Sequence, residues 1–176
     1  MPGARVESGE RVTLRTVENE DVPFLQRGSA NPALRYPLGA PVSTQSEIEE
    51  WVEDPDDDQF LVCLDGSTEC DGTRPIGFIS VQDADWRRPE LGYWLLPEVH
   101  GEGYGREAVS LVIEYVFRTY DTPGVWAVAY DFNDASRGLL ESLGFSQEGR
   151  LRKDRFVDGE YRDTIQYGLL RAEWSE

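Results

Sequence analysis

Apolar positions change their spacing several times along the chain, and each change predicts a different element. Val12 and Leu14 alternate with polar neighbours, which is the period of a half-buried strand. The spacing over 20–29 and 43–52 is helical, whereas the proline-rich stretch 31–41 between them indicates a loop. The first third of the chain is therefore expected to contain one strand followed by two helices.

The remainder of the chain alternates between strand and helix patterns. Strands are expected at 59–64, 75–82, 90–96, 125–130, 145–156 and 161–170, and helices at 106–120 and 133–143. Asp158-Gly159 is a strong hairpin signal between the last two strands. This order predicts an α/β (α+β) fold with a mixed, mainly antiparallel sheet, in which the long helix crosses between two strands. We expect one domain over 10–172 and a flexible terminus over 1–9.

The charge balance narrows the list of partners. The formal net charge is −17, and Lys153 is the only lysine. Such a surface repels nucleic acid and anionic membranes, so neither is expected as a partner. The composition favours adaptation to concentrated salt, where acidic self-repulsion is screened, over an ordinary acidic protein. No long apolar run and no apolar leader are visible, which leads us to expect a cytoplasmic protein.

Few residues are suited to metal or nucleophile chemistry. Cys63 and Cys70 lack the spacing of a metal site, and His100 is the only histidine. A zinc site, a Ser-His-Asp triad and a Cys-His pair are therefore poor hypotheses, and no metal is expected. Cys63 lies in an apolar run and is expected in the core.

A glycine-rich segment offers a more specific signal. Residues 100–105 read His-Gly-Glu-Gly-Tyr-Gly and lie between an expected strand and the long helix. Glycines let backbone N–H groups converge, and a helix N-terminus favours an anion, so the segment can hold a pyrophosphate without a lysine. No P-loop pattern exists, and Arg106 stands where a dinucleotide fingerprint needs glycine. A glycine-rich turn without any ligand is the alternative.

A second segment helps to interpret this glycine-rich loop. Residues 133–145 read Asn-Asp-Ala-Ser-Arg-Gly-Leu-Leu-Glu-Ser-Leu-Gly-Phe and follow the next strand. Together the two segments resemble the GNAT superfamily of N-acetyltransferases, and the resemblance extends from about residue 11 to 170. The family's loop is written (Gln/Arg)-x-x-Gly-x-(Gly/Ala), from which His100 departs at the first position. The resemblance implies six to seven strands, about four helices and splayed central strands.

Within the superfamily the chain is similar to the branch that acetylates the N-terminal alanine or serine of ribosomal proteins. The segments that carry this likeness are 90–95, 103–108, Asn133-x-x-Ser136 and 158–163. This branch also contains acetyltransferases for antibiotics and small amines. The resemblance therefore implies transfer of acetyl to a primary amine by direct attack. The acceptor is expected to be a protein N-terminus, with an aminoglycoside or polyamine as the alternative.

The resemblance also implies acetyl-CoA as the co-substrate. Its pantetheine arm would pair with the backbone of Leu95 and Leu96, although a plain core strand would look the same. Asn133 would bond the pantetheine, cap the following helix, or do both. The implied cofactor-binding residues are Leu95, Leu96, His100, Gly101, Glu102, Gly103, Tyr104, Gly105, Arg106, Asn133 and Ser136.

Two residues are predicted to be catalytic. Many GNAT enzymes place a tyrosine seven residues after the asparagine, but Leu140 stands there and cannot donate a proton. The resembled branch uses a serine at the position of Ser136, which we predict to protonate the leaving thiolate; a serine bonding its own helix is the alternative. Glu90 is predicted to be the base for the amine, with Asp131 and Glu141 as weaker candidates.

The acceptor side is predicted less specifically. Arg35, Tyr36, Trp86, Tyr93 and Trp94 are candidates to contact the amine substrate, although aromatic residues are more often part of a core. Two other classes of function stay open: a non-catalytic acyl-CoA-binding module and a dimerisation domain. A monomer and a homodimer are both compatible with the sequence.

Overall fold

A single mixed sheet runs through the molecule. The computed structural model describes residues 3–53, 57–65, 72–84 and 87–175. Within them the eight strands lie in the order β1-β2-β3-β4-β5-β6-β8-β7. The strands are β1 (Arg5–Ser8), β2 (Thr13–Thr16), β3 (Asp58–Leu64), β4 (Arg74–Gln82), β5 (Glu90–Leu95), β6 (Gly124–Tyr130), β7 (Ser146–Val157) and β8 (Glu160–Leu170). Every pairing is antiparallel except that between β5 and β6.

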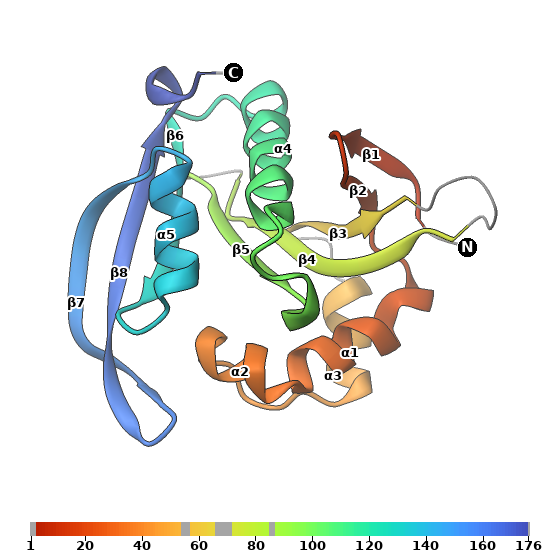
Figure 1. Cartoon of the computed structure of the whole chain (residues 1–176), viewed down its shortest axis with the longest axis horizontal. Coiled ribbons are helices and arrows are strands. Elements are labelled where there is room, and N and C mark those ends of the chain that lie inside the picture. The colour runs from red at the N-terminus through yellow and green to blue at the C-terminus, as the bar shows by residue number, and fades with distance from the viewer. Residues whose placement is uncertain (1–2, 54–56, 66–71, 85–86, 176) are drawn as a thin grey trace.

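Helices cover both faces of the sheet (Figure 1). They are α1 (Val22–Ala30), α2 (Pro32–Leu38), α3 (Gln45–Glu53), α4 (Tyr104–Thr119) and α5 (Asp134–Ser142), with 3-10 turns at Asn19–Asp21, Pro97–Val99 and Arg171–Glu173. Strand residues alternate between the two faces, as Phe60 and Leu61 illustrate. Phe60 packs into the cluster that contains Val109 of α4, whereas Leu61 packs with Leu25 of α1. The α4 side therefore holds the larger core, and α1 and α3 cover the opposite face.

The family fold expected from the sequence is confirmed, with small differences in the count of elements. The described residues form eight strands and five α-helices, against an expectation of six to seven strands and about four helices. The additional strand, β1, lies inside the terminus that was expected to be flexible. The additional helix, α2, lies inside the expected proline-rich loop.

Local chemistry explains how α2 forms despite its prolines. Asn31 caps the helix by accepting a hydrogen bond from the N–H of Ala33 at 3.0 Å. Pro32 occupies the first helical position, where no intrahelical partner is needed for an N–H. The helix ends at Gly39, which adopts the left-handed conformation with φ of 62°. Proline at this position therefore starts the helix instead of breaking it.

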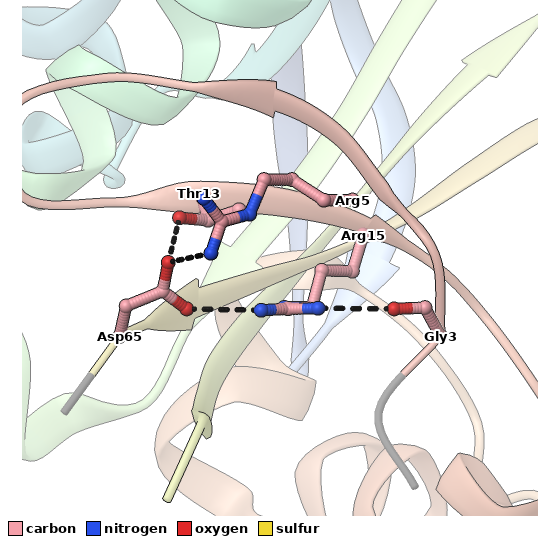
Figure 2. A network of polar contacts seen from close by, with 5 residues as sticks. All are labelled: Gly3, Arg5, Thr13, Arg15 and Asp65. Atoms are coloured by element: carbon pink, nitrogen blue, oxygen red, sulfur yellow. Dashed lines mark hydrogen bonds and ion pairs between the residues drawn. The ribbon is translucent and has the colours of Figure 1, made fainter. Parts of the chain in front are cut away.

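A polar network fixes the N-terminal strand to its neighbours (Figure 2). The carboxylate of Asp65, directly after β3, accepts hydrogen bonds from Arg5 of β1 at 2.9 Å and from Thr13 of β2 at 2.8 Å. Arg15 bonds the same carboxylate at 3.2 Å and also donates to the carbonyl of Gly3. The hydrogen bond from Thr13, with those from the arginines, holds the pKa of Asp65 below its usual range. One ionised side chain thus joins three strands.

The centre of the sheet is splayed, as the family resemblance implies. Over the whole of β5 and β6, both fully described, the register contains one residue pair, Glu90 with Trp126. The N–H of Trp126 donates to the carbonyl of Pro89 at 2.9 Å at the same end. Beyond it the two strands diverge toward Leu95 and Tyr130 (Figure 1). The sheet therefore presents unpaired backbone at its centre.

Candidate active site

The edge of β5 that faces β6 carries backbone donors without a strand partner. The N–H of Leu96 donates to the carbonyl of Ile76 at 2.8 Å, on the β4 side. Residues of an antiparallel pair alternate between those that bond the neighbour and those that point away. The N–H groups of Leu95 and Tyr93 therefore point toward the splay. Of the two leucines expected to bind pantetheine, only Leu95 offers its N–H, and Tyr93 adds a second donor.

His100 links the start of the glycine loop to this strand. Its Nε2 lies 2.8 Å from the carbonyl oxygen of Leu95. A carbonyl can only accept, so Nε2 must carry the hydrogen and donate it. The side chain that departs from the family's loop pattern thus orients the end of β5.

The glycine loop has the backbone conformation that an anion cradle requires. Gly101 and Gly103 have φ values of 80° and 83°, which side chains other than glycine rarely adopt. Gly103 is also the N-cap of α4, whose first turn exposes unpaired N–H groups. Arg106 is exposed in that turn and adds a cation. These donors fit the pyrophosphate of acetyl-CoA, in a chain with almost no lysine.

Arg11, in the turn between β1 and β2, braces the glycine loop. Its Nη1 donates to the carbonyl of Glu102 at 2.8 Å, and its guanidinium lies 4.8 Å from the centre of the Tyr104 ring. Its backbone N–H and Nε bond the two oxygens of Glu107 at 2.7 and 3.2 Å. Burial opposes ionisation of Glu107, but these hydrogen bonds and one from Val12 outweigh it and lower its pKa. Sequence reasoning missed Arg11 because the contact joins distant segments.

The first turn of α5 supplies the side chains opposite the loop. Asn133 is the N-cap, and its Oδ1 accepts from the N–H of Ser136 at 3.2 Å. Capping uses only the oxygen, so the amide NH₂ of Asn133 is left for a ligand. Leu140, at the family's tyrosine position, is fully buried in the core.

Ser136 does not bond its own helix through its hydroxyl. Its Oγ lies 2.8 Å from the hydroxyl of Tyr93 on β5. Burial raises the pKa of Tyr93 to about 12, although the bond with Ser136 opposes this. Tyr93 therefore keeps its proton near neutral pH and can donate it to Ser136. The hydrogen of Ser136 is then available to a third group, such as a leaving sulfur.

A polar network holds α5 against β8. The hydroxyl of Tyr167 donates to Oε1 of Glu141 at 2.9 Å and accepts from Nε of Arg137 at 3.3 Å. Arg137 also donates to the carbonyl of Asp131 at 3.2 Å. Glu141, a weaker candidate for the base, is thus a structural acceptor. Asp131, the other weak candidate, keeps one buried carboxylate oxygen without a hydrogen-bond partner.

Comparison with known proteins places this geometry in a family. The profile of the acetyltransferase (GNAT) domain matches residues 11–146. The chain belongs to the GNAT acetyltransferases. It is similar to YokL, an uncharacterized N-acetyltransferase derived from the SPbeta prophage of Bacillus subtilis (strain 168), with 30% identity over 95% of this chain and 94% of YokL. Acetyl-CoA is accordingly its co-substrate, and acetyl transfer its reaction.

Two further relatives differ in what they acetylate. The [ribosomal protein uS5]-alanine N-acetyltransferase of Escherichia coli (strain K12) is 32% identical over 48% of this chain and 44% of that enzyme. The crystal structure of spermidine N-acetyltransferase from Vibrio cholerae, in complex with CoA and spermine, superposes with a TM-score of 0.82. It is 22% identical, with 94% of this chain and 98% of that one covered. This second likeness shows the shared fold.

In this GNAT acetyltransferase, Glu90 lies where β5 and β6 are still paired. Strand alternation puts its side chain on the face of Trp94, opposite to that of Tyr93. Burial raises the pKa of Glu90, as do the charges of Asp83 and Asp57, whereas Arg87 lowers it. A carboxylate with a raised pKa is a better proton acceptor, which suits the predicted role of base.

The expected acceptor residues do not form one group. Tyr93 packs on the α4 side, whereas Trp94 packs against α1 on the other face, with its ring centre 5.5 Å from that of Phe24. Arg35 and Tyr36 lie together on α2, the guanidinium 4.9 Å from the ring centre. Trp86, the fifth candidate, lies outside the described residues, as does Cys70.

Two aromatic residues that the sequence analysis did not select, Tyr130 and Phe132, stack on each other at the end of β6, and Tyr130 contacts α2. The hydroxyl of Tyr130, at the end of β6, donates to the carbonyl of Leu38 at 3.4 Å. The ring of Phe132 stacks on that of Tyr130 at 5.9 Å between centres. Their position directly before Asn133, at the end of a strand that borders the splay, was the available signal. Tyr130 and Phe132 are therefore better candidates than Trp94 to line the acceptor side of the site.

Other kinds of site find little support in the described part of the chain. It contains no group of three or more His, Cys, Asp or Glu side chains able to hold a metal ion. Cys63 is buried in the core, as expected, and is a free thiol. No helix within the described ranges is long and apolar enough to cross a membrane.

Proposed function

We propose that this GNAT acetyltransferase transfers acetyl from acetyl-CoA to the α-amine of a polypeptide N-terminus, by direct attack. The observation that carries the proposal is the Tyr93–Ser136 pair beside the unpaired edge of β5, with Glu90 on the opposite face of the same strand. An acid on one side and a base on the other are what a single displacement at a thioester needs.

The chain's own groups hold the acetyl donor in place. The loop with Gly101 and Gly103 receives the pyrophosphate, and the NH₂ of Asn133 bonds the pantetheine arm. The N–H groups of Tyr93 and Leu95 point into the splay and polarise the thioester carbonyl. Because their positions are fixed by pairing of β5 with β4, they require no rearrangement as charge develops on the oxygen.

The reaction then moves two protons. The amine nitrogen forms a bond to the thioester carbon and the carbon–sulfur bond breaks. Ser136, oriented by Tyr93, gives its proton to the leaving sulfur, and the serine recovers a proton from solvent after the products leave. The nitrogen loses its proton to Glu90 across water, because a rise of about 3.3 Å per strand residue puts Glu90 roughly 10 Å from Tyr93 along β5.

A polyamine is the competing acceptor, since one of the similar structures holds spermine. The general acidity of the chain suits a polycation, with net charge −17. Close to the splay the charge balance differs from that of the whole chain. Arg35 lies on α2, and Arg162 lies over Phe132 at 4.9 Å from the ring centre. Two guanidinium groups beside the acceptor side disfavour a polycation, although Glu160 pairs with Arg162 at 3.0 Å and Asp131 keeps a carboxylate oxygen without a hydrogen-bond partner. A monocationic N-terminus is affected less.

The test is release of free CoA thiol with short peptides and with spermidine as acceptors, for the wild type and Ser136→Ala. Turnover with peptides that exceeds turnover with spermidine, and that falls by about 10²-fold in the variant, would support acceptor and mechanism together. Turnover with spermidine alone would reject the peptide acceptor and keep the acetyltransferase.

A further inference from the structure

Two adjacent arginines just before β5 contact strands on the other side of the splay. Arg87 lies over the ring of Trp126 on β6, with its guanidinium 5.4 Å from the ring centre. Nη1 of Arg88 donates to Oε1 of Glu148 on β7 at 2.9 Å, and Nη2 of Arg88 bonds Oε2 of the same carboxylate. A two-point contact between guanidinium and carboxylate fixes orientation as well as distance. The start of β5 is therefore attached to β6 and to β7.

The ion pair of Arg88 and Glu148 spans a large part of the sheet. In the strand order, β6 and β8 lie between β5 and β7. At about 4.8 Å per strand spacing, β5 and β7 are roughly 14 Å apart, which an arginine and a glutamate side chain cover together. The exposed fractions of the two side chains are 27% and 38%. The hydrogen bonds from Arg88 hold the pKa of the Glu148 carboxyl below its usual range, so the pair is ionised near neutral pH.

The local structure of β7 and β8 makes room for this ion pair. Glu148 is the extra residue of a β-bulge, because the register of β7 against β8 shifts between Gln147 and Gly149. A bulge changes the direction of a side chain. The carboxylate of Glu148 lies over Gly168 of β8, where an added Cβ would be 2.1 Å from Oε1. Gly168 does not have a positive φ, so space and not backbone conformation requires glycine there.

These contacts lie beside the proposed base. Gly168 is opposite Trp126, and Trp126 is in register with Glu90, so the three residues share one face of the sheet. At this end the N–H of Trp126 also donates to the carbonyl of Pro89, directly before Glu90, at 2.9 Å. Because β5 and β6 share a single register pair, the position of Glu90 depends on few backbone contacts. The ion pair adds a side-chain contact two residues away, at Arg88.

The charged groups around Glu90 include members of the same loop. Burial is the main cause of the raised pKa of Glu90; the charge of Arg87 opposes the rise, and those of Asp83 and Asp57 add to it. Asp83 accepts a hydrogen bond from Nε of Arg87 at 2.9 Å. Since Arg88 anchors the residue next to Arg87, its ion pair also fixes the distance between the Arg87 charge and Glu90. Displacement of this loop therefore changes both the position and the proton affinity of the carboxylate.

We infer that Arg88 and Glu148 are positioning residues for acetyl transfer, because their ion pair holds the start of β5 and thereby places Glu90 for deprotonation of the acceptor amine. The inference rests on the base assigned in the proposed function, and neither residue needs to touch a substrate. A shift of a reacting group by about 1 Å can cost as much as 10²-fold in rate, whereas a partly exposed ion pair contributes little to stability. Loss of the pair should affect turnover more than folding.

The experiment measures steady-state kinetics of three variants, Arg88→Ala, Glu148→Ala and Gly168→Ala, with whichever acceptor the wild type acetylates. Gly168→Ala keeps both charges and displaces only the flexible end of the Glu148 side chain. Each variant should lower kcat by about tenfold, with KM for acetyl-CoA changed by less than about twofold. The double variant of Arg88 and Glu148 should be no slower than either single variant, because both remove one contact.

A matched control separates this ion pair from ion pairs in general. Arg74→Ala removes an exposed ion pair with Glu98, at 3.6 Å, in which both residues lie on the β5 side of the splay. This variant should keep the wild-type kcat. If Arg74→Ala lowers kcat as much as Arg88→Ala does, a specific role of the pair with Glu148 is rejected.

The pH profile distinguishes positioning from a purely structural role. In the three variants the charge of Arg87 is held less firmly near Glu90, so the acid limb of kcat/KM should move to higher pH. Wild-type kcat and an unmoved limb, even with a lower melting temperature, would overturn the inference. If Glu90→Gln removes the limb while these variants leave it in place, the proposed base stands and the inference fails. A limb that persists in Glu90→Gln rejects both.

Discussion

The guanidinium of Arg11 donates to the carbonyl of Glu102 at 2.8 Å, across 91 positions of sequence. The same side chain bonds Glu107 and covers the ring of Tyr104, so one residue of the turn before β2 fixes both the loop and the first turn of α4. The backbone proposed to receive the pyrophosphate is therefore held in shape by the turn before β2, a strand that does not itself border the splay.

Replacement of Arg11 by alanine should weaken the binding of acetyl-CoA. We expect KM for acetyl-CoA to rise by about tenfold with kcat changed much less, because the brace orders the loop before the ligand arrives. Steady-state kinetics with acetyl-CoA varied will measure both. Arg5→Ala, which removes an ion pair with Asp65 on the same hairpin, is the control. A fall in kcat at constant KM would contradict a role in loop order.

Ser136 and Tyr93 should behave as one unit. Ser136→Ala is expected to lower kcat by about 10²-fold, and Tyr93→Phe by about tenfold because the serine hydrogen loses its orientation. Since both act on the same proton, the double variant should be no slower than Ser136→Ala alone. Additive losses in this double-mutant cycle would show that the two hydroxyl groups act independently.

Glu90 should set the acid limb of the pH profile. Burial raises its pKa above the usual glutamate range, so kcat/KM should fall with decreasing pH while ordinary glutamates are still ionised. Glu90→Gln should remove this limb and lower the rate. The folded state holds the proton more tightly than the unfolded chain, so ionised Glu90 destabilises the fold and the variant should melt at a higher temperature at neutral pH. An unchanged pH profile in the variant would assign the base elsewhere.

Asp65 should stabilise the N-terminal strands only while it is ionised. Its pKa lies below the usual range because Thr13, Arg15 and Arg5 favour the charged form. The stabilisation is therefore present above the pKa of the unfolded chain and is lost as pH falls through the lower folded value. Asp65→Asn should cost about 1 kcal/mol at neutral pH, as expected for a partly exposed network, and nothing at low pH. Denaturant unfolding at both pH values is the measurement.

Salt should stabilise this protein. With 34 acidic and 17 basic residues, the folded chain repels itself, and added salt shortens the range of that repulsion. We expect the melting temperature to rise from about 0.1 to about 1 M salt, a range in which the Debye length falls from ~10 to ~3 Å. Sodium chloride and potassium chloride should act alike if screening is the cause. A melting temperature that is flat over this range would reject adaptation to salt.

Local patterns in the sequence were sufficient for the long elements. The helix of α4 and the Asp158-Gly159 hairpin were predicted to within a few residues, because periodicity and turn chemistry act locally. Strand β1 was missed because its four residues are exposed at both ends, only partly buried between them, and carry no clear pattern. The stretch that forms α2 was interpreted as a loop because Pro32 looks like a breaker until its position at the helix start is known.

The same distinction between local and tertiary signals applies to the candidate site. The glycine loop and the first turn of α5 have contiguous motifs, so their residues could be named from sequence. The partner of Ser136 could not, since Tyr93 is 43 positions away and only strand alternation decides which way its ring points. Arg11 and Tyr130 were missed for the same reason, because their importance comes from tertiary contacts.

The splay between β5 and β6 has a mechanical consequence. A single residue pair joins the half-sheet β1–β5 to the half-sheet β6–β8–β7, so the two halves meet at a hinge-like seam. In the proposed function, an extended pantetheine arm lies between them and takes the place of a missing strand. The acetyl donor is then a structural member of the sheet as well as a reactant. Its departure after each turnover leaves the two halves joined by that residue pair, by the ion pair of Arg88 and Glu148, and by α4, the crossover helix between β5 and β6.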